Sequence, residues 1–361
     1  MEKKRDSGIE LLRIFAMLMV IGVHIFLYGN YFDRACEYGG IVASSARYMK
    51  LFFRPAVNIF VIITGYFMVH VSFDLRKSYR RLLPIYGSIY FYSLVIGIIV
   101  LVARSHFEVD LPDYLIVWKM LFPLASQQWY FLTDYFLMCL LAPFLNIILH
   151  KISKREYQSL IIVTTLIMSI WPTLYSLKPF AEVFSGYGYG IFASGKNMFS
   201  FLYVYMLGGY IGLYAKGKSR PQPIYLFAFF ISVLLNYLVW RHCGADYENV
   251  ALNYTNPLIV LATVFSLLFF KDLHFYSKAV NLLASTTIGI YAFHESSYMR
   301  EFIWKRINFA KMNCSNLVIN LLRIICVMIL IFTVGAVIEL ARKQIFHIVG
   351  SGFQKVRNRE G

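Results

Sequence analysis

Glu10-Leu-Leu-Arg-Ile-Phe-Ala-Met-Leu-Met-Val-Ile-Gly-Val-His24 is an apolar run that contains a carboxylate, a guanidinium and an imidazole. Its length and apolar character predict a membrane-spanning helix over about residues 8–28. Arg13 and His24 are eleven residues apart, so at about 100° per residue they return to within roughly 20° of one helix face. At about 1.5 Å per residue they lie roughly 16 Å apart along the axis. Glu10 precedes Arg13 by one turn, so the two side chains can pair.

Ionisable side chains in the middle of a bilayer are expensive, at about 2.5–3.5 kcal/mol each on insertion scales. Three of them on or near one face have two interpretations. They could form a buried polar cluster that only ties helices together, or they could form a functional site. The cost of burying them favours the functional site, with Glu10, Arg13 and His24 as its candidate catalytic residues.

The composition is that of an integral membrane protein, with 59% hydrophobic residues and a mean hydropathy of +0.60. The net charge of +16 does not indicate a nucleic-acid partner, because the cations are scattered between apolar segments. We predict an all-α, polytopic membrane protein that contacts membrane lipid and forms a single domain over residues 1–361. About ten spans are expected, at 8–28, 48–70, 83–103, 128–149, 159–177, 197–215, 223–241, 256–270, 281–297 and 317–341.

An even number of spans places both termini on one side. The loops on that side, if it is cytoplasmic, contain more Lys and Arg than the opposite loops, which predicts cytoplasmic termini and a short basic tail at 342–361. The last outer loop is unusually basic. No small-x-small cleavage site follows the first apolar run, so we expect this run to be a retained span rather than a signal peptide.

The five cysteines show no metal-ligand spacing, and no metal site is expected. Cys139 and Cys326 fall inside predicted spans, where they are expected to be core residues. Cys36, Cys243 and Cys314 fall in loops predicted to lie outside, so one disulfide is possible there. The sequence does not say which pair would form it.

Four cations, Arg76, Lys77, Arg80 and Arg81, lie directly before Pro84 and the third predicted span. A cytoplasmic anchor that follows the positive-inside rule would explain the charge alone. The density of the cluster beside a span also suits a phosphate-bearing ligand held at the cytoplasmic face.

Two later spans add candidates for an acceptor-binding or supporting site. Trp129 and Tyr130 are typical of an outer aromatic belt, and Asp134 lies inside the fourth span, where it needs a partner such as Arg54 or Arg323. His294 and Glu295 close the ninth span near the outer side. A histidine there is commonly a solvated end residue, but beside a buried His24 it becomes a second candidate.

With these residues in hand, the chain resembles the acyltransferase family 3 membrane proteins, a bacterial group that includes many O-acetyltransferases of surface polysaccharides. The resemblance covers about residues 7–340. Its most specific element is the pair Arg13 and His24, preceded by Glu10. It continues in Val57-Asn-Ile-Phe-Val-Ile-Ile-Thr-Gly-Tyr66, the basic run before Leu82-Leu83-Pro84, Trp129-Tyr130, Pro143-Phe-Leu-Asn146, Asn256-Pro257 and Ile288-Gly-Ile-Tyr-Ala-Phe-His294. The family's usual Arg-x-x-Arg before the third span is replaced by Lys77 and Arg80, and lysine lacks the bidentate fork.

The resemblance implies a membrane acyltransferase in the bacterial plasma (inner) membrane. Its acyl group, most commonly acetyl, would pass from cytoplasmic acyl-CoA to a hydroxyl of an extracytoplasmic polysaccharide or glycolipid. Acyl-CoA would be a co-substrate held by the cluster Arg76–Arg81, with no bound cofactor and with polysaccharide-assembly proteins as possible partners. His24 would deprotonate the acceptor hydroxyl or briefly bear the acyl group, while Glu10 and Arg13 would order the donor end.

Two other classes remain open at this point. A transporter or flippase for a lipid-linked sugar would have a similar topology, and a catalytically silent subunit of a polysaccharide synthase would not need His24 or Arg13. The spacing of Arg13 and His24 and the family pattern favour the acyltransferase.

Overall fold

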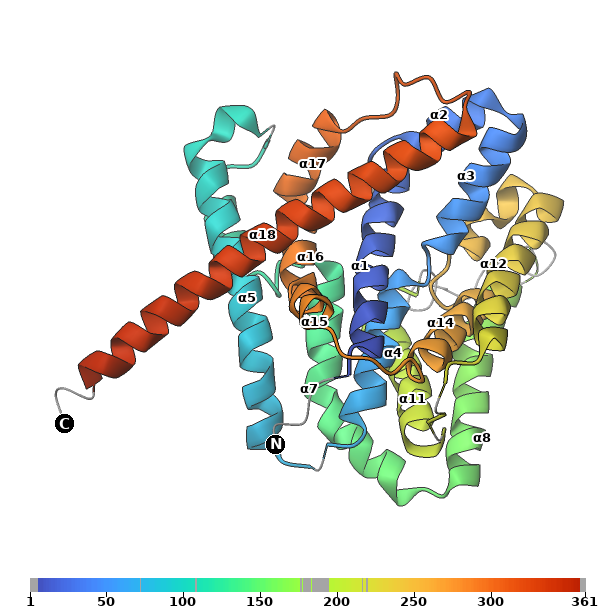
Figure 1. Cartoon of the computed structure of the whole chain (residues 1–361), viewed down its shortest axis with the longest axis horizontal. Helices are drawn as coiled ribbons and strands as arrows, with labels where there is room; N and C mark the ends of the chain where they lie inside the picture. The colour runs from blue at the N-terminus through green and yellow to red at the C-terminus, as the bar shows by residue number, and fades with distance from the viewer. Residues whose placement is uncertain are drawn as a thin grey trace.

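The computed structural model shows an all-helical protein, and no strand occurs in the part of the chain that it describes. The described residues are 6–71, 73–107, 109–175, 177, 183, 195–215, 217, 218 and 220–357. The predicted all-α fold is confirmed (Figure 1).

The elements follow one another in chain order, with several short helices between the long ones. They are α1 (Gly8–Leu27), α2 (Tyr31–Tyr38), α3 (Gly40–Phe52), α4 (Ala56–Met68), α5 (Leu75–Val102), η1 (Arg104–His106), α6 (Asp113–Leu121), α7 (Tyr130–Lys151), α8 (Lys154–Thr165), the π-helical η2 (Leu166–Ile170), α9 (Trp171–Tyr175), α11 (Met198–Tyr214), α12 (Pro223–Cys243), η3 (Ala245–Tyr247), α13 (Glu248–Ala251), α14 (Pro257–Phe270), α15 (Lys278–Ala284), α16 (Thr287–Glu295), α17 (Ser297–Arg306) and α18 (Leu317–Arg357).

Seven helical segments of the described chain are long and apolar enough to cross a membrane. They are Gly8–Leu27, Gly40–Met68, Leu75–Val102, Tyr130–Lys151, Lys154–Tyr175, Pro223–Cys243 and Leu317–Ile348. Two shorter apolar helices, Met198–Tyr214 and Pro257–Phe270, correspond to the sixth and eighth predicted spans. The membrane-protein class is confirmed, while the total of ten crossings and the cytoplasmic location of both termini stay predictions.

The ninth predicted span, 281–297, is not one continuous helix, because α15 ends at Ala284 and α16 begins at Thr287. The hydroxyls of Ser285, Thr286 and Thr287 each donate to a backbone carbonyl three residues earlier. Such side-chain bonds compete with the helical ladder and favour a break. The last span differs in the opposite sense, since α18 continues through most of the predicted tail, to Arg357, and its end extends away from the bundle (Figure 1).

Helix α1 lies at the centre of the bundle, where it packs against α4, α14, α15, α16 and α18 (Figure 1). Ala16, Ile21 and Ile25 are fully buried on it. Neighbouring α4 and α11 approach closely at Gly65 and Gly208, where an added Cβ would lie 2.1 and 2.2 Å from a backbone oxygen of the facing helix. Small residues of this kind let helix backbones pack tightly in a membrane.

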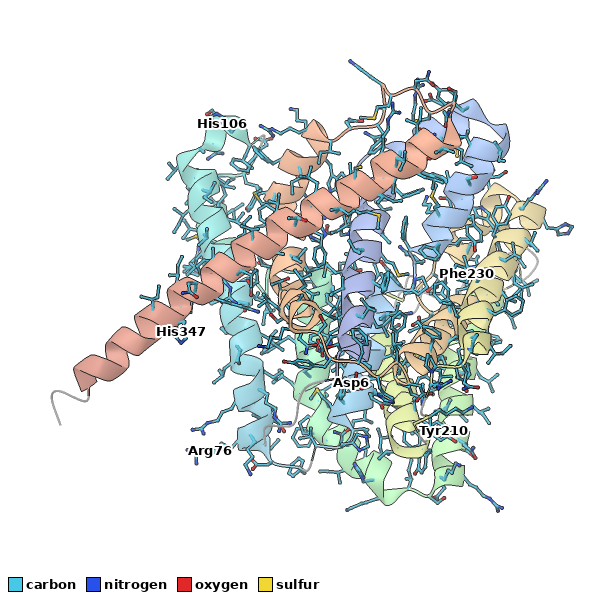
Figure 2. The ribbon with its side chains drawn as sticks, viewed as in Figure 1. Asp6, Arg76, His106, Tyr210, Phe230 and His347 are labelled. Carbon is cyan, nitrogen blue, oxygen red and sulfur yellow. The ribbon has the colours of Figure 1, made fainter. Side chains whose placement is uncertain are left out.

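The two ends of the bundle are marked by different charged and polar residues. Figure 2 shows Asp6 and Arg76 toward one end and His106 at the opposite end. The N-terminus of α1 and the basic start of α5 therefore lie on the same side, as the predicted topology requires.

The cysteine predictions are only partly met. All five cysteines are free, so the possible disulfide among Cys36, Cys243 and Cys314 is absent. Cys139 is buried as predicted, whereas Cys326 is exposed on α18 instead of lying in the core.

Candidate active site

Two buried histidines from distant parts of the sequence meet in the interior of the bundle. His24 lies in the last turn of α1 and His294 near the end of α16, and they are 7% and 0% exposed. The His24 Nδ1 and His294 Nε2 atoms are 3.1 Å apart, which is hydrogen-bonding distance. The structure therefore brings together two predicted site residues that are 270 positions apart.

A carboxylate and a guanidinium complete this cluster. The His24 Nε2 atom lies 3.2 Å from Oε2 of Glu295, and the Arg300 Nη1 atom lies 3.2 Å from Oε1 of the same carboxylate. Arg300 also donates to the Tyr28 hydroxyl at 3.3 Å. Tyr28 follows His24 by one helical turn, so α1 and the α16–α17 segment are joined through a continuous polar chain.

The hydrogen-bond partners fix where the ring protons lie. The His294 Nδ1 atom is 2.6 Å from the Ile290 carbonyl, which only accepts, so Nδ1 has the hydrogen. A neutral His294 then accepts at Nε2 from the Nδ1–H of His24. The remaining nitrogen of His24, Nε2, then has no hydrogen and is the basic atom. It lies 3.2 Å from Oε2 of Glu295, an oxygen that makes no hydrogen bond within the described part of the chain.

Local sequence features position Glu295 and Arg300. Ser296 leaves the helical conformation and its side chain caps the start of α17 by accepting from the Met299 N–H. This break makes Glu295 the last residue of α16 and places Arg300 in the first turns of α17. The indole N–H of Trp129 donates to the Ala292 carbonyl at 3.1 Å, which holds the start of α7 against α16.

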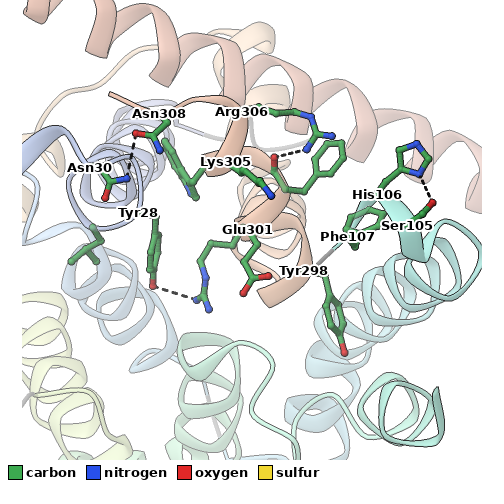
Figure 3. A pocket seen from close by; sticks show the side chains of 14 residues that line it. Tyr28, Asn30, Ser105, His106, Phe107, Tyr298, Glu301, Lys305, Arg306 and Asn308 are labelled. Atoms are coloured by element: carbon green, nitrogen blue, oxygen red, sulfur yellow. Dashed lines mark hydrogen bonds between the residues drawn. The ribbon is translucent and has the colours of Figure 1, made fainter. Parts of the chain in front are cut away.

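Two cavities adjoin the cluster and share Arg300. The larger, of about 960 Å³, is lined by Tyr28 and by residues of α17 and η1 (Figure 3). The smaller, of about 270 Å³, is lined by Glu295, Arg300 and the Gln127–Tyr130 segment. The cluster therefore borders polar space that can admit a ligand at Tyr28, Glu295 and Arg300, whereas the two histidines lie behind these residues and line neither cavity.

An aromatic chain extends from the histidines into the bundle. Ring centroids are 5.2 Å apart for His24 and His294, 6.0 Å for His294 and Tyr291, and 5.2 Å for Tyr291 and Phe131. Tyr135 continues the chain at 5.6 Å from Phe131, and its hydroxyl bonds Thr64. The Tyr291 hydroxyl is buried and has no hydrogen-bond partner among the described residues.

Glu10 and Arg13 form the predicted ion pair, with 2.7 Å between the Arg13 Nη1 and Glu10 Oε1 atoms. The pair lies in the opposite half of α1 from His24. The structure thus separates the three candidate catalytic residues into two groups, with only His24 inside the histidine cluster.

The four cations of the basic run are exposed at the start of α5: Arg76, Lys77, Arg80 and Arg81. Lys77 lies 3.3 Å from the Asp74 carboxylate, which also caps α5 by accepting from the Lys77 N–H. The cluster is accessible on the same side as Asp6 and opposite His106 (Figure 2), whereas His24 lies in the last turn of α1.

The supporting candidates on α7 have different environments. The Tyr130 hydroxyl is 3.3 Å from that of Tyr254, and the Lys196 ammonium lies 5.3 Å from the Tyr130 ring centroid. Asp134 is half-buried, and no cation of the described chain pairs with it. Arg54 stacks on Tyr254 and donates to the Leu252 carbonyl, and Arg323 donates to the Asn313 carbonyl, so neither is the expected partner of Asp134.

Sequence reasoning missed Arg300, Tyr28 and Tyr291 as site residues. Tyr28 and Tyr291 could have been found from helical spacing, since they lie four residues after His24 and three before His294. Arg300 had no such signal, because its position depends on the break at Ser296. No group of three or more His, Cys, Asp or Glu in the described ranges has metal-binding geometry.

Comparison with known proteins gives one match over most of the chain. A family model described as an acyltransferase domain matches residues 6–340. A curated amino-acid racemase from Enterococcus faecalis is 31% identical over 99 residues, which cover 26% of this chain and only 13% of the racemase. No solved structure matches the chain.

Replacing Arg300 tests the charge balance of the cluster. Arg300→Gln should lower the stability of the protein in detergent by about 1.5–3 kcal/mol, because the buried Glu295 carboxylate loses a charged partner. Adding Glu295→Gln should recover much of the loss, as expected for an interacting pair. Thermal unfolding of both variants, with the exposed Arg241→Gln as control, measures this. An Arg300→Gln variant as stable as Arg241→Gln would contradict the ion pair.

Proposed function

The chain belongs to acyltransferase family 3, and we propose that it is an O-acyltransferase of the bacterial plasma membrane. It transfers an acyl group, commonly acetyl in this family, from cytoplasmic acyl-CoA to a hydroxyl of an extracytoplasmic polysaccharide or glycolipid. The observation that supports this most directly is the buried His24, held by His294 and Glu295 beside two polar cavities.

His24 acts as the general base in this proposal. Its Nδ1–H is engaged by His294, so the basic Nε2 faces Glu295, which lines the smaller cavity. Nε2 takes the proton of the acceptor hydroxyl as its oxygen attacks the thioester carbonyl. His294 orients the ring through Nδ1, the nitrogen that the third group of a catalytic triad engages, and the Glu295 carboxylate beside Nε2 supplies negative charge that stabilises the imidazolium.

The proton is returned when the thioester bond breaks. The tetrahedral intermediate collapses, the carbon–sulfur bond is cleaved, and the imidazolium protonates the departing thiolate. An alcohol and an acyl-CoA are thereby converted into an ester and free CoA, with no net change in the enzyme.

Tyr291 supplies a hydrogen-bond donor for the oxyanion. Its hydroxyl is buried beside His294 with no partner among the described residues. A donor that is already desolvated and oriented stabilises charge that develops only in the transition state.

The donor enters from the opposite side. The exposed cations at the start of α5 suit the phosphates of CoA, and Glu10–Arg13 lies at the same end of α1. Because Arg13 and His24 are roughly 16 Å apart along the helix, the thioester end has to reach inward over that distance, and we place its route beside Tyr135, Phe131 and Tyr291, whose rings form a chain that leads to His294.

A transporter for a lipid-linked sugar remains the alternative. It does not require a basic nitrogen oriented by a second histidine, and export would continue without His24. Activity of variants therefore separates the two functions.

The His24→Ala variant should lose transfer of radiolabelled acetyl from acetyl-CoA into membrane or cell-surface glycan by about 100-fold or more, since it removes the base. His347→Ala, at an exposed histidine of α18, is the matched control and should keep full activity. Equal labelling by the two variants at matched expression would remove His24 from the mechanism.

Tyr291→Phe should lower kcat by about 100-fold, the typical effect of losing one oxyanion donor, while the KM for acetyl-CoA stays near wild type. The variant should be as thermally stable as wild type or more so, because the deleted hydroxyl has no partner to leave behind. Steady-state kinetics and thermal unfolding test both parts. A large loss of stability would indicate a structural role instead.

Lys77→Ala combined with Arg80→Ala should raise the KM for acetyl-CoA more than it lowers kcat, because the cations bind phosphates far from the reacting atoms. Lys151→Ala combined with Arg155→Ala removes two exposed cations elsewhere and is the control. An unchanged donor KM in the first variant would exclude the start of α5 as the CoA site.

A further inference from the structure

We propose that the acceptor has an acidic group, a phosphate or a carboxylate, near the hydroxyl that is acylated, and that α17 binds this group. The inference rests on the proposed acyl transfer and defines the substrate class for the same site. It follows from the charge, the position and the unused hydrogen-bond donors of the larger cavity.

The wall of that cavity is cationic. Arg300, Lys305 and Arg306 line it, against one carboxylate among its described lining residues, Glu301. The smaller cavity adds Lys119 against Glu295, and it meets the larger one at Arg300. A ligand that spans the two cavities would therefore lie beside more cations than carboxylates, which favours an anion.

Membrane topology does not explain these cations. In the predicted orientation α17 and its following loop lie outside, where the positive-inside rule disfavours Lys and Arg. In Figure 1 α17 lies toward the end of the bundle that holds His106 in Figure 2, opposite Arg76 and Asp6. The placement of Arg300, Lys305 and Arg306 against this bias points to a function for their charge.

Arg306 is held in place without using its charge on a carboxylate. Its guanidinium lies 3.5 Å from the Phe302 ring centroid and donates from Nη1 to the Phe302 carbonyl. No ion pair with Arg306 occurs among the residues described. Since a guanidinium has five N–H donors, most of them stay available for a bidentate contact with an acidic oxygen.

Two neutral donors in the same wall are also unused. The Tyr298 hydroxyl and the Trp304 indole nitrogen are buried, and neither has a hydrogen-bond partner within the described part of the chain. Their side chains are 6% and 3% exposed, and both line the larger cavity. A buried donor without an acceptor destabilises the protein, and acceptor oxygens of a sugar or its acidic substituent would remove that cost.

Aromatic faces complete the match to a carbohydrate. Tyr28, Phe107 and Tyr298 lie around the cavity together with the amides of Asn30 and Asn308, which bond each other at 3.3 Å (Figure 3). Apolar faces combined with a few polar groups are typical of pockets that orient a small ligand. The cations then distinguish an acidic sugar from a neutral one.

Binding of defined sugars to the purified full-length protein in nanodiscs tests the inference. The probes are glucose 1-phosphate and glucuronic acid as acidic sugars, glucose as the neutral sugar, and inorganic phosphate as the anion alone. Calorimetry should give at least about tenfold tighter binding for one of the acidic sugars than for glucose or phosphate, because it makes both kinds of contact. Which acidic sugar binds tighter distinguishes a phosphorylated from a uronic-acid acceptor.

The variant Lys305→Gln with Arg306→Gln should remove this preference, and both side chains are exposed, so folding should be preserved. Tyr298→Phe should weaken binding without loss of thermal stability. Arg241→Gln, at an exposed arginine outside the cavity, should bind as wild type does.

Equal binding of glucose and the acidic sugars, or no binding of either acidic sugar, would overturn the proposal. So would a preference that survives in the double variant. Inorganic phosphate binding as tightly as the acidic sugars would indicate a simple anion site and would also overturn it. Because no acyl donor is present, these outcomes are independent of label transfer, whose absence in the wild type would overturn the proposed function instead.

Discussion

The contact between His24 and His294 is the interaction on which the site depends. It joins the central helix α1 to α16 across 270 positions of sequence, inside a bundle whose other contacts are largely apolar. In such surroundings a polar group without a partner is costly, and three of the four ring nitrogens have a specific hydrogen-bond partner, which leaves only Nε2 of His24 without one among the described residues. The same constraint that stabilises the pair also gives His24 one defined basic atom.

The rigidity of α16 is maintained by a second buried network on its other side. The Tyr92 hydroxyl donates to Glu339 at 2.9 Å, and Arg342 binds the same carboxylate through two nitrogens at 2.7 and 2.6 Å. Glu339 packs directly on Gly289, where an added Cβ would lie 2.3 Å from its Oε2 atom. Helices α5 and α18 therefore hold α16 at a residue less than two turns before His294. Positioning of the histidine depends on residues that do not touch the reacting groups.

Local helical periodicity was enough to predict part of the site from the sequence. The predictions were wrong where the position of a side chain depends on contacts with distant parts of the chain. Helical spacing placed Glu10 beside Arg13, and the cost of buried charge identified His24, because both arguments use only neighbouring residues. The same reasoning assigned Glu10, Arg13 and His24 to one catalytic group, although the length of α1 separates the pair from the histidine. The break between α15 and α16 depends on three hydroxyls that donate hydrogen bonds to backbone carbonyls three residues earlier. A hydrophobic pattern contains no information about such bonds. The failed pairing of Asp134 with Arg54 shows the same limit, since Arg54 lies on Tyr254 instead.

The separation along α1 has a mechanistic consequence. In the proposed mechanism, a donor bound at the cations of α5 and an acceptor bound at α17 would occupy opposite ends of α1, so neither substrate would need to cross the membrane whole. Only the acylated end of the donor would have to travel the distance between Arg13 and His24. The groups beside the proposed route are mostly aromatic rings, and its polar groups are the hydrogen-bonded pair Tyr135–Thr64 and the Tyr291 hydroxyl. A thioester is neutral and tolerates such a lining, whereas the phosphates of CoA do not. Such a lining would favour passage of the acyl end and retention of the charged end beside the cations of α5.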